Sequence, residues 1–190
     1  NAGTASPYDF ALGGAGVPAL PLGSNGTPLK EGMAVMVDMA GNYGGYYSDL
    51  TRTYSIGQLP EEAYRLHNLS LQLHREVMQQ AKPGSSCAEL WDECLHRVEA
   101  AGAKDYFMGT ELQAQFVGHG LGLQINELPV LTGRSKDILE EGMIIAFEPK
   151  FVLPGVGAVG IENTYLVTSS GVECLTPAPE EIIDLNQVPR

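Results

Sequence analysis

The spacing of hydrophobic residues divides the chain into a strand-rich first part, two helices and a strand-rich last part. Residues 33–38 and 45–56 are rich in β-branched, aromatic and apolar residues and predict two strands. The turn-rich segment AGNYGG joins them. A further short strand is predicted at Tyr8–Leu12, inside a stretch at residues 1–32 that is rich in glycine and proline.

Two helices are predicted next. The first begins at Pro60, carries leucines and a valine at helical spacing, and stops at Pro83-Gly84. The second begins with the capping box formed by Ser86 and Glu89 and ends at Gly102. These helices also carry histidines, which we interpret as ordinary surface or boundary residues: His67, His74 and His96.

The last third of the chain is strand-like again, at residues 115–125, 142–153 and 159–168. The order of strands, two helices and strands is typical of an α+β domain in which helices cover a curved, mostly antiparallel sheet. No short repeat and no interdomain linker is visible. We therefore expect residues 1–190 to form a single domain.

Composition and charge restrict the function further. At 190 residues, 44% of them hydrophobic, the chain is long enough for one well-packed globular domain. The net charge of −12 argues against binding to a nucleic-acid backbone and suits a protein that holds cations. No apolar run approaches the roughly 20 residues that a membrane helix needs. We expect neither a nucleic acid nor a membrane as partner.

The cysteines indicate a reducing compartment. Cys87, Cys94 and Cys174 are an odd number and lack the CxxC spacing of zinc sites. The predicted location is the cytoplasm. Cys87 and Cys94 lie seven residues apart on a predicted helix, which favours small core residues.

Side chains that can bind metals stand within these apolar, strand-like segments. They are Asp38, Asp49, His119, Glu148 and Glu162. Burying one unpaired carboxylate costs roughly several kcal/mol, so four in one core must be neutralised. Arg52 and Lys150 are the only basic residues adjacent to any of them in the sequence. Two divalent cations would balance the four carboxylates.

The donor set contains many oxygens, one nitrogen and no sulfur. This set favours Mn²⁺, Fe²⁺, Co²⁺ or Zn²⁺ over copper or an iron–sulfur cluster, with Mn²⁺ our first choice. The alternative is that each acid caps a strand end or pairs with a nearby base. That alternative explains any one of these residues, but it explains five residues placed in this way poorly.

Four segments of the chain resemble, in order, the motifs of the pita-bread metallopeptidases. This superfamily includes methionine aminopeptidase, aminopeptidase P, prolidase and, without metal, creatinase. The segments are VDMAGNYGGYYSDLTRT, GHGLGLQINELP, GMIIAFEP and GIENTYLVT, within a resemblance that runs from about residue 8 to residue 168. The SDLTRT run is more similar to the aminopeptidase P, prolidase and creatinase branch than to methionine aminopeptidase.

The resemblance implies a two-metal centre. It implies that Asp38 is bidentate to one ion, that Asp49 and Glu162 bridge both ions, and that His119 binds the second ion with Glu148 beside it. In such enzymes a water between the ions attacks the scissile amide, and Glu148 is the expected proton carrier. The implied activity is that of an Xaa-Pro aminopeptidase or dipeptidase acting on short peptides.

Three positions depart from the family pattern. Asn126 stands where the peptidases have a second histidine. An asparagine can bind a substrate carbonyl or stabilise an oxyanion, but it cannot carry a proton. Gly160 stands where prolidase-type enzymes have an arginine. The window at Leu20-Pro21 lacks a further substrate-facing histidine. We retain Asn126 and Glu148 as the candidate catalytic residues.

The resemblance also implies that the first helices of the catalytic domain precede residue 1, so we expect a fragment truncated at its N-terminal end. A partner or a homodimer would then cover the sheet face that those helices leave open. Two other functions stay open beside peptide hydrolysis. One is metal-dependent hydrolysis or elimination of a small non-peptide metabolite. The other is a non-catalytic, metal-binding relative.

Overall fold

A long β-hairpin begins the part of the chain that the structure, a computed structural model, describes: residues 28–188. Strands β1 (Ala34–Tyr43) and β2 (Tyr46–Ser55) pair antiparallel along their whole length. Gly44 and Gly45 form the turn with φ of 60° and 89°, the left-handed conformation that a tight hairpin needs. The connection is therefore shorter than the predicted AGNYGG segment. The predicted strand at Tyr8–Leu12 lies outside the described residues.

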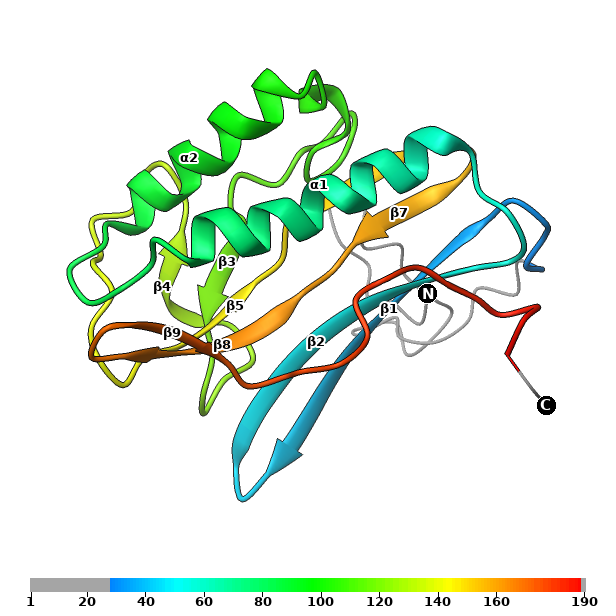
Figure 1. Cartoon of the computed structure of the whole chain (residues 1–190). Coiled ribbons are helices and arrows are strands. Elements are labelled where there is room, and N and C mark those ends of the chain that lie inside the picture. The colour runs from blue at the N-terminus through cyan, green and yellow to red at the C-terminus, as the bar shows by residue number, and fades with distance from the viewer. Residues whose placement is uncertain (1–27, 189–190) are drawn as a thin grey trace.

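Helices α1 (Glu61–Met78) and α2 (Cys87–Ala100) follow the hairpin and lie on the same side of the strands, as Figure 1 shows. Pro60 is the N-cap of α1, as the sequence predicts, but α1 ends before Pro83. The predicted capping contact of α2 is present, because the hydroxyl of Ser86 accepts from the backbone N–H of Glu89 at 3.3 Å. A short 3₁₀ helix, η1 (Lys104–Tyr106), comes next.

The strands of the last third are shorter than predicted. The expected strand over 142–153 is two strands, β5 (Ile144–Phe147) and β6 (Lys150–Leu153). The expected strand over 159–168 is also two, β7 (Gly157–Gly160) and β8 (Asn163–Thr168). The other strands of this part are β3 (Gly118–Gly120), β4 (Glu127–Leu131), β9 (Gly171–Cys174) and β10 (Ile183–Asp184).

These strands form a mostly antiparallel arrangement, as predicted for an α+β domain. One sheet has the order β4-β3-β5-β8-β9, a second pairs β6 with β7, and a third has the order β1-β2-β10. The short pairing of β10 with β2 is parallel. A bridge between Thr51 of β2 and Glu162 links the hairpin to the break between β7 and β8.

The core lies between the helices and the strands that they cover. Buried leucines and valines of α1 and α2 pack with Phe147, Phe151 and neighbouring apolar side chains of the sheet. Cys87 and Cys94 are buried in this core, which confirms the interpretation from the sequence, and Cys174 is half-buried. Among the described residues, no helix is long and apolar enough to cross a membrane.

Candidate metal centre

The break between β5 and β6 and the break between β7 and β8 bring Glu148 and Glu162 close together in space. Strand β5 ends at Phe147, which pairs with Asn163 at the start of β8. Glu148 follows that pair and Glu162 precedes it, so both glutamates lie at the same end of two adjacent strands. Both side chains are buried. An apolar pattern that runs across each break hides this arrangement in the sequence.

Asp49 and His119 reach the same point from two other strands. The backbone of Thr51 exchanges hydrogen bonds of 3.3 and 3.1 Å with that of Glu162. Asp49 lies two positions before Thr51 and therefore on the same face of β2. His119 lies on β3, opposite Ala146 of β5. Strands far apart in the sequence thus converge on one cluster.

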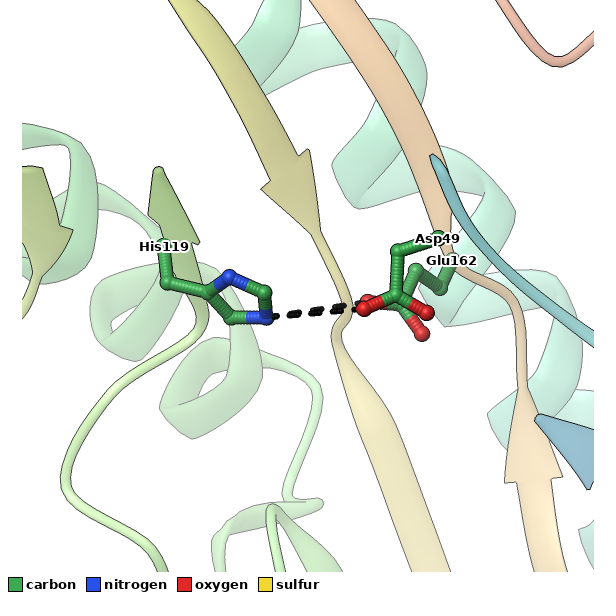
Figure 2. Close-up of side chains that lie close together, drawn as sticks. All are labelled: Asp49, His119 and Glu162. Carbon is green, nitrogen blue, oxygen red and sulfur yellow. Dashed lines mark ion pairs between the residues drawn. The ribbon is translucent and has the colours of Figure 1, made fainter. Parts of the chain in front are cut away.

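The imidazole of His119 faces the carboxylates of Asp49 and Glu162, as Figure 2 shows. Its Nε2 lies 4.0 Å from Asp49 Oδ2 and 4.0 Å from Glu162 Oε1. One ligand atom from each of the three residues lies within 4.8 Å of the others. Atoms that bind one ion at about 2.0–2.2 Å lie up to about 4.4 Å apart. The three side chains therefore fit a divalent cation after a small contraction.

Glu148 extends this triad. Its Oε1 lies 3.3 Å from His119 Nε2. The other ring nitrogen of His119, Nδ1, donates to the carbonyl of Gly120 at 3.1 Å, which leaves Nε2 directed at the carboxylates. The donor set is oxygen-rich with one imidazole, the chemistry expected for Mn²⁺, Co²⁺, Fe²⁺ or Zn²⁺.

The triad needs positive charge. Burial, reinforced by Asp38 and Glu148, raises the pKa of Asp49 to about 7. Burial also raises the pKa of Glu162 to about 8, although Lys150 opposes the shift. A cation bound here would supply the charge that protons otherwise supply, so its binding would release protons.

Glu148 and His119 form a charged pair in the same cluster. Burial acts to raise the pKa of Glu148, but Lys150 and His119 hold it at about 2. Burial acts to lower the pKa of His119, but its contact with Glu148 raises it to about 9.

Lys150, two residues after Glu148 in the sequence, joins the cluster in the fold. It begins β6 and its side chain is 1% exposed. Its Nζ lies 2.7 Å from Glu148 Oε2 and 3.4 Å from Glu162 Oε2. Glu148 and Lys150 are separated only by Pro149 in the break between β5 and β6, and their side chains meet within the cluster.

Asp38 lies at the edge of the cluster. Its carboxylate is 3.4 Å from Lys150 Nζ, and its side chain is 53% exposed. The triad of ligand atoms does not include it. Its assignment as a bidentate ligand stays a prediction, as do the bridging roles of Asp49 and Glu162.

Asn126 lies in an exposed bend just before β4. Within residues 28–188, no described hydrogen bond joins it to the cluster. A catalytic role for Asn126 stays a prediction, and so does proton transfer by Glu148. The Leu20-Pro21 window lies outside the described residues.

Polar side chains of α1 fix the backbone of both strand breaks. The hydroxyl of Ser70 donates to the carbonyl of Pro149 at 2.7 Å and accepts from the N–H of Ile161 at 3.1 Å. His67 Nδ1 accepts from the N–H of Gly160 at 3.2 Å, and His74 Nε2 donates to the carbonyl of Ile161 at 3.2 Å. The helix therefore positions the segments that carry Glu148 and Glu162.

The interpretation of the helical histidines is wrong for two of them. His67 and His74 are buried, and only His96 is exposed. The backbone N–H and carbonyl groups freed where the strands break need partners in the core, and imidazoles supply them. The signal in the sequence was the spacing of His67, Ser70 and His74 on the apolar face of one helix.

Arg52 also positions the backbone rather than neutralising the cluster. Its Nη1 donates to the carbonyl of Glu162 at 2.8 Å and to that of Thr51 at 2.9 Å. Its Nε donates to the carbonyl of Pro179 at 2.8 Å, which ties the C-terminal segment to β2. The basic residue beside Asp49 in the sequence thus holds Glu162 in place through its main chain.

The local backbone also explains the absence of an arginine at position 160. Gly160 has a φ of +132°, which L side chains rarely adopt, and an added Cβ would lie 2.6 Å from the carbonyl oxygen of Pro149. That carbonyl is the one held by Ser70. A larger residue would displace the strand break beside Glu148.

Comparison with known proteins gives a consistent family. The family model "Metallopeptidase family M24" matches residues 6–169. The chain is 32% identical over 166 residues to an "Xaa-Pro dipeptidase" of Pyrococcus furiosus, covering 87% of this chain and 46% of that protein. The chain thus spans about half the length of the curated relatives it matches.

Solved structures agree. The prolidase of Pyrococcus horikoshii superposes with a TM-score of 0.77 at 30% identity, over 89% of this chain and 46% of that one. A methionine aminopeptidase from Thermotoga maritima superposes with a TM-score of 0.63 at 28% identity, over 78% of this chain and 66% of that one. The predicted pita-bread fold is confirmed.

Proposed function

The chain belongs to metallopeptidase family M24, and from this premise we propose that it hydrolyses short peptides with a divalent cation held by Asp49, His119 and Glu162. The observation that carries the proposal is the buried cluster of these three side chains, to which Glu148 is joined through His119. A buried set of carboxylates with one imidazole has the donor chemistry that divalent cations such as Mn²⁺ and Zn²⁺ prefer, which supports the proposal. The peptidase class follows from the family.

The residues of this chain divide the work of such a site. A divalent ion supplies a Lewis acid that polarises a carbonyl and makes a water molecule more acidic. His119 and the carboxylates of Asp49 and Glu162 hold the ion, and Glu148 lies close enough to His119 to accept or return a proton at its carboxylate. The burial of these side chains limits access of bulk water.

The substrates we propose are short peptides with proline in the second position. Support comes from the relatives, one of which is named an Xaa-Pro dipeptidase and another a prolidase. Asn126 is proposed to bind a substrate carbonyl through its amide when a peptide is present. The choice between dipeptidase and aminopeptidase activity is left to the experiment below.

Peptide hydrolysis by the full-length protein tests the proposal. After reconstitution with Mn²⁺ or Co²⁺, we expect release of the first residue from Xaa-Pro dipeptides, from longer Xaa-Pro peptides, or from both. A matched panel with alanine in place of proline tests the specificity. No cleavage of any peptide by metal-loaded, folded protein would overturn the proposal.

Matched variants connect the activity to the cluster. His119→Ala removes a ligand of the triad, and His96→Ala removes an exposed histidine of α2. We expect the first change to abolish hydrolysis together with metal binding and the second to leave both unchanged. Equal activity of the two variants would show that hydrolysis does not depend on this site.

A second candidate function keeps the metal but acts on a small non-peptide amide or amidine, by hydrolysis or elimination. The observation in its favour is Asn126, which stands where the peptidases have a histidine and cannot carry a proton. Turnover of such metabolites without cleavage of peptides would establish this alternative. A non-catalytic role is disfavoured, because the triad and Glu148 are all present.

Other assignments stay predictions. The resemblance implies two metal ions, and we propose from it Mn²⁺ as the preferred metal and a single catalytic domain over 1–190, and, from the cysteines, a location in the cytoplasm. A homodimer is also predicted. Apolar side chains are exposed near the turn of the β1–β2 hairpin and near the start of β4, where a second copy of the chain could cover them: Tyr43, Tyr46, Leu123 and Leu128. Analytical ultracentrifugation of the full-length protein tests the homodimer.

A further inference from the structure

We propose that the ammonium group of Lys150 occupies the position of the second cation, so that the centre binds one divalent ion and not two. The inference rests on the proposed metal site at Asp49, His119 and Glu162, and it deepens that proposal by assigning the rest of the cluster. The position of Lys150 Nζ among three carboxylates carries it.

Glu148 and Glu162 each direct one carboxylate oxygen toward His119, on the side of the triad, and the other toward the ammonium group of Lys150. Glu148 directs Oε1 at His119 Nε2, at 3.3 Å, and Oε2 at Lys150 Nζ, at 2.7 Å. Glu162 directs Oε1 at His119 Nε2, at 4.0 Å, and Oε2 at Lys150 Nζ, at 3.4 Å. Carboxylates that bridge two cations divide their oxygens in this way. Here the triad forms one of the positions and the ammonium fills the other.

Asp38 completes the position around the ammonium. It reaches Lys150 Nζ with Oδ2, at 3.4 Å, and the triad does not include it. The residue that the resemblance assigns as a bidentate ligand of one ion is thus paired with the lysine. A second divalent ion would compete with Nζ for the same oxygens, and like charges at contact distance repel.

Lys150 cannot withdraw from this position without a large cost. Its side chain is 1% exposed, and its backbone pairs with Gly160 as the first residue of β6. Its carbonyl accepts from the N–H of Met108 at 2.8 Å, which fixes the strand on its other side. Moving the ammonium away from the carboxylates would leave a charge unpaired in the core.

Metal stoichiometry of the full-length protein tests the inference without any assay of activity. After reconstitution with excess Mn²⁺ and removal of free metal, elemental analysis is expected to give one equivalent per chain. Electron paramagnetic resonance is expected to show the hyperfine pattern of an isolated Mn²⁺ ion. Two equivalents with the spectrum of an exchange-coupled pair would overturn the inference.

Substitution of the lysine tests the cause. Lys150→Ala removes the ammonium and opens its space, so we expect a folded variant to bind two equivalents. Lys136→Ala, at an exposed position, is the matched control and is expected to bind one. A folded Lys150→Ala protein that still binds one equivalent would show that the lysine does not exclude the second ion. Should the variant fail to fold, the wild-type stoichiometry and spectrum decide.

The outcomes separate this inference from the proposed function. Wild-type protein that binds two ions and cleaves peptides would overturn the role of Lys150 and leave the peptidase proposal intact. Protein that binds one ion and cleaves no peptide would overturn the peptidase proposal and leave the role of Lys150 intact. Protein that binds no metal would overturn both.

Discussion

The hydroxyl of Ser70 donates a hydrogen bond of 2.7 Å to the carbonyl of Pro149, the residue after Glu148. The same hydroxyl accepts from the N–H of Ile161, the residue before Glu162, at 3.1 Å. One buried side chain of α1 therefore holds both breaks in the strands that carry the glutamates. The geometry of the metal centre depends on a helix that contributes no ligand.

Replacement of Ser70 by alanine should weaken both the fold and the metal centre. It leaves a carbonyl and an N–H without this partner in the core, at about 1–3 kcal/mol for each buried group. We expect the free energy of unfolding to fall by about 2 kcal/mol and Mn²⁺ affinity to fall by about 10–100-fold. Urea unfolding and isothermal titration calorimetry measure the two effects.

Ser169→Ala is the matched control for this prediction, because Ser169 lies in an exposed turn after β8. It should change neither quantity. A Ser70→Ala protein with wild-type metal affinity would show that the strand breaks hold their shape without the helix contact.

Gly160 should tolerate no side chain. Gly160→Ala combines a φ of +132° with a Cβ placed 2.6 Å from the Pro149 carbonyl oxygen. We expect a loss of about 3 kcal/mol in the free energy of unfolding, from backbone strain and overpacking together. Gly155→Ala is the control: its φ is +79° but an added Cβ meets nothing within 4 Å, so it should lose only about 1–2 kcal/mol. Equal losses would mean that the contact with Pro149 relaxes freely.

The sequence predicted the helices and the residues of the triad, but not the strand breaks. Helix signals are local, so Pro60 and the Ser86 capping box placed both helix starts correctly. The apolar pattern continues through Glu148-Pro149, and periodicity alone cannot tell one strand from two. The proline was the available signal, because it cannot donate within a sheet.

The contacts around Lys150 and Ser70 depend on tertiary structure. Lys150 follows Glu148 by two residues, so their contact is local in sequence, but the approach of Lys150 to Glu162 requires the sheet to bring the two breaks together. The roles of His67 and His74 were missed for the same reason: their partners are backbone groups nearly a hundred residues away in sequence. Local rules cannot identify such partners.

Asp49 and Asp38 should differ in their contribution to metal binding. Asp49 is buried within the triad, whereas Asp38 is half-exposed and its carboxylate lies on Lys150. Asp49→Asn should lower Mn²⁺ affinity by at least ~100-fold, and Asp38→Asn by at most ~10-fold. Calorimetric titration of both variants gives the comparison. Equal, large losses would instead support Asp38 as a ligand, as the resemblance implies.

The fold should lose stability as the pH falls, because it keeps His74 neutral while the unfolded chain takes up a proton. Burial lowers the pKa of this imidazole from 6.5 to about 3, and its Nδ1 accepts from the hydroxyl of Tyr165 at 2.9 Å. In the unfolded chain the same group takes up a proton below about pH 6.5, whereas in the folded protein it stays neutral until about pH 3. The free energy of unfolding therefore loses about 2 kcal/mol from this group between pH 6.5 and pH 5.

Comparison of wild type with His74→Gln isolates this contribution, because glutamine has an amide donor and acceptor but does not titrate in this range. The carboxylates of the metal centre titrate in both proteins and cancel in the difference. We expect the wild type to lose stability more steeply than the variant as the pH falls below 6.5, measured by urea unfolding of metal-free protein. His96→Gln, at an exposed position, should follow the wild-type slope. Parallel slopes for wild type and His74→Gln would mean that the folded protein accommodates a charged imidazole at this position.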